Sequence, residues 1–156
     1  MPVTVDYVPS PTDDARALIG ELDAELNADY PPEQRHGFSV DRVFQPDVLF
    51  FVARLDGEPA GCGAVALADG YGEVKRMYVR PTARGKSVAQ AVLERIEQEA
   101  RTRKVARLVL ETGDIRHAAM RFYERAGFTR CGAFGPYLDM PAHAIERSVF
   151  YEKRLG

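Results

Sequence analysis

The sequence lacks the features that mark membrane-spanning, nucleic-acid-binding and metal-cluster proteins. No apolar run approaches the ~20 residues that a membrane-spanning helix needs. A net charge of −2 over 156 residues gives no basic footprint for nucleic acid. Two cysteines, Cys62 and Cys131, are too few for a metal cluster, so we expect no bound metal. The first residues have neither a charged leader nor an apolar signal core, which favours a cytoplasmic protein without membrane or nucleic-acid partners.

What remains is an ordinary globular composition, with 46% hydrophobic and 28% charged residues. We found no internal repeat, low-complexity segment or linker. A chain of this length can bury a core of its own, and we therefore expect a single domain over residues 1–156.

The hydrophobic periodicity predicts strands that alternate with three main helices. Strands are expected over residues 3–8, 48–54, 59–68, 71–79, 106–112, 128–134 and 145–153, and helices over 12–28, after Arg84, and over 114–126. Asp56-Gly57 and Asp69-Gly70 are turn signals between consecutive strands. The order predicts an α+β fold with a mixed, mostly antiparallel sheet, in which the middle helix crosses over between two parallel central strands.

One segment predicts a phosphate site. The strand 74–79 ends at Pro81, and a helix with an apolar stripe begins near Val88. The first turn of such a helix presents free N–H groups and the positive end of the helix dipole, which bind phosphate. Gly85-Lys86-Ser87 imitates the end of a nucleotide-binding P-loop, but that motif needs glycine at position 80, which is Arg80.

The six residues from Arg84 to Ala89 instead resemble the acyl-CoA pyrophosphate loop of the GNAT N-acetyltransferase family, [QR]-x-x-G-x-[GA]. The preceding residues 77–81 also look like the family's lead-in. Ser87 stands at the middle glycine of the pattern, which suits the loop if its φ stays negative.

A second stretch supports the same family. Its pattern A-x-x-[LFY]-Y-x-x-x-G-F is met by Ala119, Phe122, Tyr123, Gly127 and Phe128. We expect a short helix there, with Asp114 as its N-cap and Gly127 as its left-handed stop. Many members have an asparagine that contacts the cofactor where this chain has Arg116, so that contact is not carried over.

The resemblance implies the GNAT fold and acetyl-CoA as co-substrate. It also implies that the backbone of the central strand and of the loop holds this molecule, with its thioester where strand 71–79 and residues 108–112 splay apart. The cofactor-binding residues that it implies are Met77, Tyr78, Val79, Arg84, Gly85, Lys86, Ser87, Val88 and Ala89.

Catalysis needs a group that takes the proton of the attacking amine, because a lysine-like amine with a pKa of about 10.4 is mostly charged at neutral pH. Glu73, four residues before Met77 and expected on the same face of the strand, is the first candidate, and Glu111 is its competitor. Tyr123 matches the family's general acid, which protonates the departing CoA thiolate; packing beside Phe122 is the alternative reading.

The resemblance therefore implies an N-acetyltransferase that acts on a primary amine of a small molecule or peptide by direct attack in a ternary complex. An acyl-CoA-binding sensor and a non-catalytic subunit of a larger assembly are the alternatives, and a homodimer stays open. The first predicted helix carries several acids with only Arg16 opposing them, which could form an acidic rim for a cationic acceptor or an ordinary solvated face.

Overall fold

The computed structural model describes residues 2–156 and is built on a seven-stranded sheet with the strand order β1-β2-β3-β4-β5-β7-β6. The strands are β1 (Val3–Tyr7), β2 (Val48–Leu55), β3 (Glu58–Ala68), β4 (Tyr71–Val79), β5 (Arg107–Gly113), β6 (Thr129–Cys131) and β7 (Ser148–Arg154). β4 and β5 are parallel, and the other neighbouring pairs are antiparallel. The predicted mixed, mostly antiparallel sheet is confirmed.

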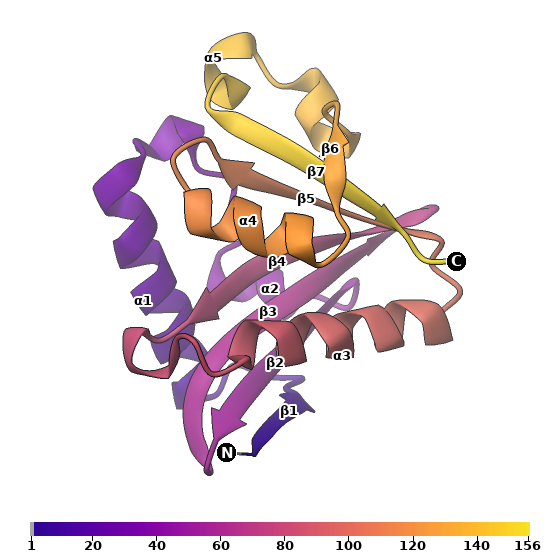
Figure 1. Cartoon of the computed structure of the whole chain (residues 1–156). Helices are drawn as coiled ribbons and strands as arrows, with labels where there is room; N and C mark the ends of the chain where they lie inside the picture. The colour runs from indigo at the N-terminus through magenta and orange to yellow at the C-terminus, as the bar shows by residue number, and fades with distance from the viewer. Residues whose placement is uncertain (1) are drawn as a thin grey trace.

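Helices cover both faces of this sheet (Figure 1). They are α1 (Asp13–Asp29), α2 (Val40–Val43), α3 (Val88–Thr102), α4 (His117–Arg125) and α5 (Ala142–Ile145), with short 3₁₀ helices at Pro32–Gln34, Pro81–Ala83 and Gly135–Asp139. One hydrophobic cluster joins α3 and α4 to the sheet, and a second joins α1 and α2 to its other face. Within residues 2–156, none of the helices is both long and apolar enough to cross a bilayer.

Local sequence signals explain several of these boundaries. The side chain of Thr12 accepts a hydrogen bond from the Ala15 amide at 3.1 Å, so it caps α1. Asp56 and Gly57 have φ values of 51° and 85°, as the tight turn between β2 and β3 requires. Gly127 has a φ of 99° and confirms the left-handed stop after α4.

An irregularity in β4 changes which way its side chains point. The register between β3 and β4 shifts so that Gly63 faces both Arg76 and Met77, and Arg76 takes a φ of 56°. The thiol of Cys62 donates to the Arg76 carbonyl at 3.3 Å. Burial raises the pKa of this thiol to about 12.

Because of this bulge, the expectation that Glu73 and Met77 share a face was wrong. Met77 packs into the cluster that contains Val92 of α3. The Glu73 carboxylate instead accepts hydrogen bonds from Tyr137 and Lys75, away from α3. Strict alternation fails wherever one extra residue is inserted in a strand.

β4 and β5 separate soon after they pair. Their register runs from Gly72 opposite Leu108 to Val74 opposite Leu110 and then ends. The rest of β4, residues 75–79, continues without β5 beside it, as Figure 1 shows between β4 and α4. The predicted crossover through α3 and the predicted splay are both confirmed.

Two expectations near the C-terminus were wrong in detail. The strand predicted over 128–134 is limited to Thr129–Cys131, and a 3₁₀ helix and α5 delay β7 until Ser148. Gly135, with a φ of 48°, turns the chain away from the sheet, and Phe134 and Tyr137 then pack with Phe150 in a small separate cluster.

Asp114 does not cap α4, which starts at His117 with Arg116 at the cap position. Its carboxylate accepts a hydrogen bond from Arg147 at 3.2 Å and a longer one from Tyr30 at 3.4 Å. The local pattern assigned Asp114 to the helix cap, but its side chain instead bonds to Arg147 and Tyr30, which are distant in the sequence.

The close approach of β3 to β4 generates a first prediction. A Cβ at Gly61 would lie 2.6 Å from the backbone oxygen of Tyr78, which can move only if β4 moves. We expect Gly61→Ala to cost about 1–3 kcal/mol of stability. In a protein of this size, each kcal/mol corresponds to a fall in Tm of roughly 2–4 °C in thermal denaturation followed by circular dichroism.

Gly20→Ala is the matched control. Gly20 lies in α1, and nothing approaches its Cβ position within 4 Å. This substitution should stabilise the protein by roughly 0.5–1 kcal/mol through helix propensity. Equal effects of the two substitutions would contradict the contact at Gly61.

Candidate active site

The loop between β4 and α3 contains two residues with a positive φ, on either side of Lys86. Gly85 has a φ of 76° and Ser87 has a φ of 65°. The condition set for Ser87, a negative φ, is therefore not met. A non-glycine residue in this region costs roughly 1–2 kcal/mol, so the loop holds local strain at the position of the family's glycine.

The start of α3 is open to a ligand. Ser87 is the N-cap residue, and its side chain makes no capping hydrogen bond. The first-turn amides therefore have no side-chain acceptor at the N-cap, which is the arrangement that binds anions. A groove of about 660 Å³ lies here, lined by Arg84, Gly85, Ser87, Val88 and Ala89 together with residues of α4. Lys86, the remaining residue of the predicted loop, is exposed and does not line this groove.

A second groove of about 400 Å³ continues from the first along β4. Met77, Tyr78 and Val79 line it on the strand side. Val79, Arg84, Ala89 and Phe122 line both grooves, which makes them one channel between β4, the loop and α4. Apart from Lys86, all predicted cofactor-binding residues line this channel.

A smaller cavity of about 120 Å³ lies at the far end of the channel, where β4 and β5 have separated. Its walls come from α1, the loop that follows α1, β4, β5 and α4. Met77, Arg116, Ala119 and Tyr123 line both this cavity and the second groove. A molecule in the channel and a molecule in the cavity would meet at these four side chains.

Tyr123 is one of the shared residues. It is 7% exposed, and its ring packs against Phe122 and Phe128 with centroids 5.2 and 5.6 Å away. Burial raises the pKa of its hydroxyl, and the charge of Arg116 opposes this only partly. The phenol is therefore protonated at neutral pH.

The two candidate bases lie in different surroundings. Glu111 lines the cavity and accepts a hydrogen bond from Ser148 at 2.6 Å. Burial raises the pKa of this carboxyl, while the bond from Ser148 lowers it. Glu73 is 7% exposed, does not line the cavity, and accepts from Tyr137 at 2.7 Å and from Lys75 at 3.3 Å.

Lys75 connects β4 to the loop that closes the cavity. Its ammonium donates to the His36 carbonyl at 2.5 Å and lies 4.4 Å from the centre of the Phe38 ring. Burial lowers the pKa of this ammonium, and the charge of Glu73 opposes the shift. The contact holds residues 36–38 against the sheet.

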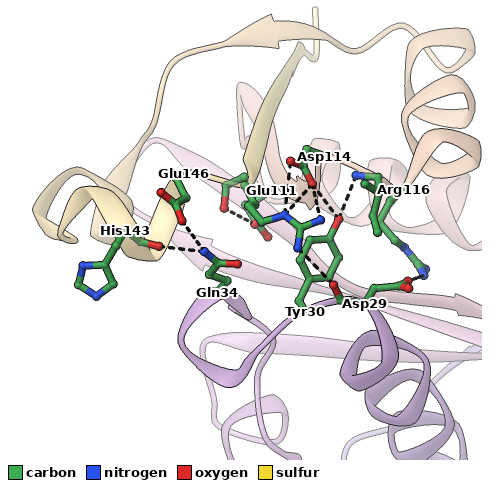
Figure 2. A network of polar contacts seen from close by, with 11 residues as sticks. Asp29, Tyr30, Gln34, Glu111, Asp114, Arg116, His143 and Glu146 are labelled. Carbon is green, nitrogen blue, oxygen red and sulfur yellow. Dashed lines mark hydrogen bonds and ion pairs between the residues drawn. The ribbon is translucent and has the colours of Figure 1, made fainter.

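Further hydrogen bonds hold the same loop from its other side (Figure 2). The Tyr30 hydroxyl accepts from the Ile115 amide at 3.0 Å and donates to Asp114. Gln34 donates to Glu146 at 2.8 Å and to the His143 carbonyl at 3.3 Å. These bonds join the loop after α1 to the end of β5 and to α5. They therefore hold residues 30–37, which contribute one wall of the cavity and are called its roof below.

The acids of α1 do not form the free acidic rim that the sequence suggested. Five of them pair with arginines: Asp14 with Arg54, Glu21 with Arg80, Asp23 with Arg76, Glu25 with Arg84, and Glu25 and Asp29 with Arg116. These arginines lie in distant segments of the chain, so a count of charges along α1 alone could not predict the pairs.

Sequence reasoning missed the polar residues in the cavity roof and against it, notably Arg35, Gln34 and Lys75. They lie in or against an irregular loop that has no periodicity and matches no motif. A metal centre is also not apparent, since the described residues 2–156 contain no group of three His, Cys, Asp or Glu side chains that could hold a metal ion.

The loop geometry predicts opposite effects for two neighbouring substitutions. Gly85→Val places a branched side chain at a positive φ beside the open helix N-terminus, and we expect it to raise the Kd for acetyl-CoA at least tenfold, which is about 1.4 kcal/mol. Ser87→Gly removes a side chain from a positive φ and should leave the Kd and the Tm equal to or better than those of the wild type.

Thermal shift and calorimetric titration with acetyl-CoA measure both effects. Wild-type protein should gain about 2.7 kcal/mol at a hundredfold excess over the Kd. Unchanged binding in Gly85→Val would mean that the pyrophosphate lies elsewhere.

Comparison with known proteins gives the family. Residues 17–128 match the model of the Acetyltransferase (GNAT) family. An IAA acetyltransferase of Azospirillum brasilense is 45% identical over 149 residues, covering 94% of both chains. Mouse N-acetylaspartate synthetase is 36% identical over 139 residues, which cover 86% of this chain and 45% of the mouse protein.

A solved structure agrees over the whole fold. A Klebsiella pneumoniae protein assigned to the acyl-CoA N-acyltransferases superposes with a TM-score of 0.77 at 34% identity, covering 99% of this chain and 98% of the other. With the open channel and the two sequence motifs, these matches lead to one conclusion: the chain belongs to the GNAT family and is an acetyl-CoA-dependent N-acyltransferase.

Proposed function

We propose that this enzyme transfers the acetyl group of acetyl-CoA to the primary amine of a small molecule, and that both substrates are bound when the amine attacks. One observation carries the proposal: the channel at the α3 loop and the cavity of about 120 Å³ share Met77 and Tyr123. A thioester in the channel would therefore meet an amine in the cavity directly. The small volume favours a small molecule over a peptide as acceptor.

Glu111 is the proposed proton acceptor. The transfer forms a bond between nitrogen and the acetyl carbon, and the nitrogen must lose a proton. Glu111 lines the cavity, and burial moves the pKa of its carboxyl toward the range useful for a base. Glu73, our first candidate, lies behind the cavity with its carboxylate bound to Tyr137 and Lys75, and this favours a structural role.

Tyr123 is the proposed proton donor to the sulfur that leaves as the carbon–sulfur bond breaks. Its phenol stays protonated at neutral pH because burial raises its pKa. Its position at the junction of channel and cavity supports this role over simple packing.

The overall proposal is tested by the release of CoA, followed with a thiol reagent, over a panel of primary amines. The panel includes polyamines, aminoglycosides and amino acids. Aspartate is among them because N-acetylaspartate synthetase is similar to this chain. Amine-dependent release with an acetylated product supports the function; hydrolysis alone, with no acetylated amine, contradicts it.

Tyr123→Phe separates acid catalysis from packing. Phenylalanine keeps the ring between Phe122 and Phe128 but removes the hydroxyl. We expect kcat to fall by about 10²–10⁴, as loss of a general acid does, with the Kd for acetyl-CoA and the Tm near those of the wild type. Activity within about threefold of wild type would leave Tyr123 with a packing role only.

Glu111→Gln tests the base, with Glu73→Gln as the matched control. Glutamine can still accept the bond from Ser148, so we expect kcat to fall by about 10²–10⁴ without loss of fold. The sign for stability follows from the raised pKa: above that pKa the folded protein holds a desolvated carboxylate, and glutamine removes this cost. The Tm of Glu111→Gln at neutral pH should therefore not fall.

The control should behave in the opposite way. Glu73→Gln leaves the buried ammonium of Lys75 without its carboxylate, so we expect the Tm to fall. The kcat of the protein that remains folded should fall far less than that of Glu111→Gln. In wild-type enzyme, activity should fall with falling pH through the pKa of Glu111, above the usual value of about 4.3 for glutamate. If the folded Glu111→Gln variant had a normal kcat, another group would have to be the proton acceptor.

A further inference from the structure

More positive than negative side chains line the small cavity. Arg35, Lys75, Arg76 and Arg116 line it, whereas Glu111 is the one acid among the described residues that line it.

Most of these cations already have partners among residues 2–156. Lys75 pairs with Glu73 at 3.3 Å, and Arg76 pairs with Asp23. Arg116 lies 3.6 Å from Glu25 and 3.8 Å from Asp29. Their charges therefore serve to hold the walls together.

Two charged groups of the cavity are left over, and they have opposite signs. Within residues 2–156, neither Arg35 nor Glu111 takes part in an ion pair. The Nε atom of Arg35 is also buried, with no hydrogen-bond partner among these described residues. A buried donor left unsatisfied costs about 1–3 kcal/mol, more when it is charged, and a ligand that accepted this hydrogen bond would offset the cost.

We propose that the acceptor carries a carboxylate as well as its amine, and that Arg35 binds this carboxylate while Glu111 faces the amine. Guanidinium groups bind carboxylates through two parallel hydrogen bonds, which gives Arg35 a specific partner. Because both residues line one cavity of about 120 Å³, a molecule that touches both has the size of an amino acid. The inference rests on the proposed function and names its substrate class.

The surroundings of Arg35 support the assignment. Gln34, the residue before it, lines the same cavity as Glu111 and is held by Glu146, as Figure 2 shows. Gly37, two residues after it, has no side chain to obstruct Arg76; a Cβ there would collide with the Arg76 guanidinium. Arg76 lines the same cavity, and its Nε is also buried with no hydrogen-bond partner among the described residues.

A cofactor phosphate is a poorer partner for Arg35. Arg35 lines neither of the two grooves that form the channel along β4 and the α3 loop. Arg84 and the open amides of α3 lie at that channel instead. The position of Arg35 thus separates recognition of the acceptor from recognition of acetyl-CoA.

The experiment compares matched acceptors with and without the carboxylate, such as L-alanine with L-alaninamide and L-aspartate with its diamide. Rates are compared per neutral amine, because the amide lowers the pKa of the neighbouring amine. Wild-type enzyme should prefer the acids at least tenfold in kcat/KM. Arg35→Gln should lower kcat/KM for the acids about a hundredfold, mainly through KM, and leave the amides and the KM for acetyl-CoA unchanged.

Two further variants test the paired donors of Arg35 and the specificity of the effect. Arg35→Lys keeps the charge but not the paired donors and should recover part of the preference for acids. Arg101→Gln removes an exposed arginine of α3 and should leave every parameter at the wild-type value. Calorimetric binding of the acids to the complex of enzyme and CoA provides a readout that does not need turnover.

The outcomes separate this inference from the proposed function. If amines are acetylated but the carboxylate gives no advantage, the inference is overturned and the acetyltransferase activity remains. If acids bind in an Arg35-dependent way without being acetylated, the carboxylate site remains and the proposed function fails. If neither binding nor acetylation depends on Arg35, the assignment of Arg35 is wrong.

Discussion

The parting of β4 from β5 after Val74 is the constraint on which the rest of the site depends. Two parallel strands that stayed paired would fill the space between them with their own hydrogen bonds. Here the pairing stops after three residues on each strand, and the bulge at Arg76 turns the remainder of β4. The freed edge borders the channel, and the gap beyond it is the cavity. Donor and acceptor sites are thus two consequences of one break in the sheet.

The bulge also requires electrostatic support from α1. It leaves the Arg76 side chain only 2% exposed and oriented toward the helix, where Asp23 neutralises it. A buried guanidinium without such a partner would cost several kcal/mol. The acids of α1 are therefore better explained by the arginines they face than by attraction of a substrate.

The sequence predicts the parts of this molecule that rest on local chemistry. The loop from Arg84 to Ala89, the tight turn at Asp56-Gly57 and the stop at Gly127 follow from residue preferences over a few positions, and the structure has them. The parallel crossover through α3 follows from element order alone. The cofactor-binding residues were implied by the resemblance to the GNAT family, and eight of the nine line the channel.

What the sequence could not predict depends on contacts between distant segments. The sequence could not rank Glu73 against Glu111, because the hydrogen bonds from Tyr137 to Glu73 and from Ser148 to Glu111 come from over thirty residues away in the chain. The bulge that separates the faces of Glu73 and Met77 appears only in the register with β3. Arg35 has no motif around it, and its place in the wall of the cavity depends on segments that are distant in the sequence.

Buried charges of the scaffold are paired, whereas groups that lower the stability of the free protein lie at the proposed site. Glu73 and Lys75 are buried together and compensate one another, as charges that serve the scaffold must. Arg35 and Glu111 line the cavity without an ion pair among the described residues, and Ser87 holds a positive φ where glycine would be easier. Such groups lower the stability of the free protein, and a ligand that binds them raises it again. Uncompensated groups therefore gather at the two ends of one path, at the α3 loop and in the cavity, where acetyl-CoA and a charged acceptor would meet them.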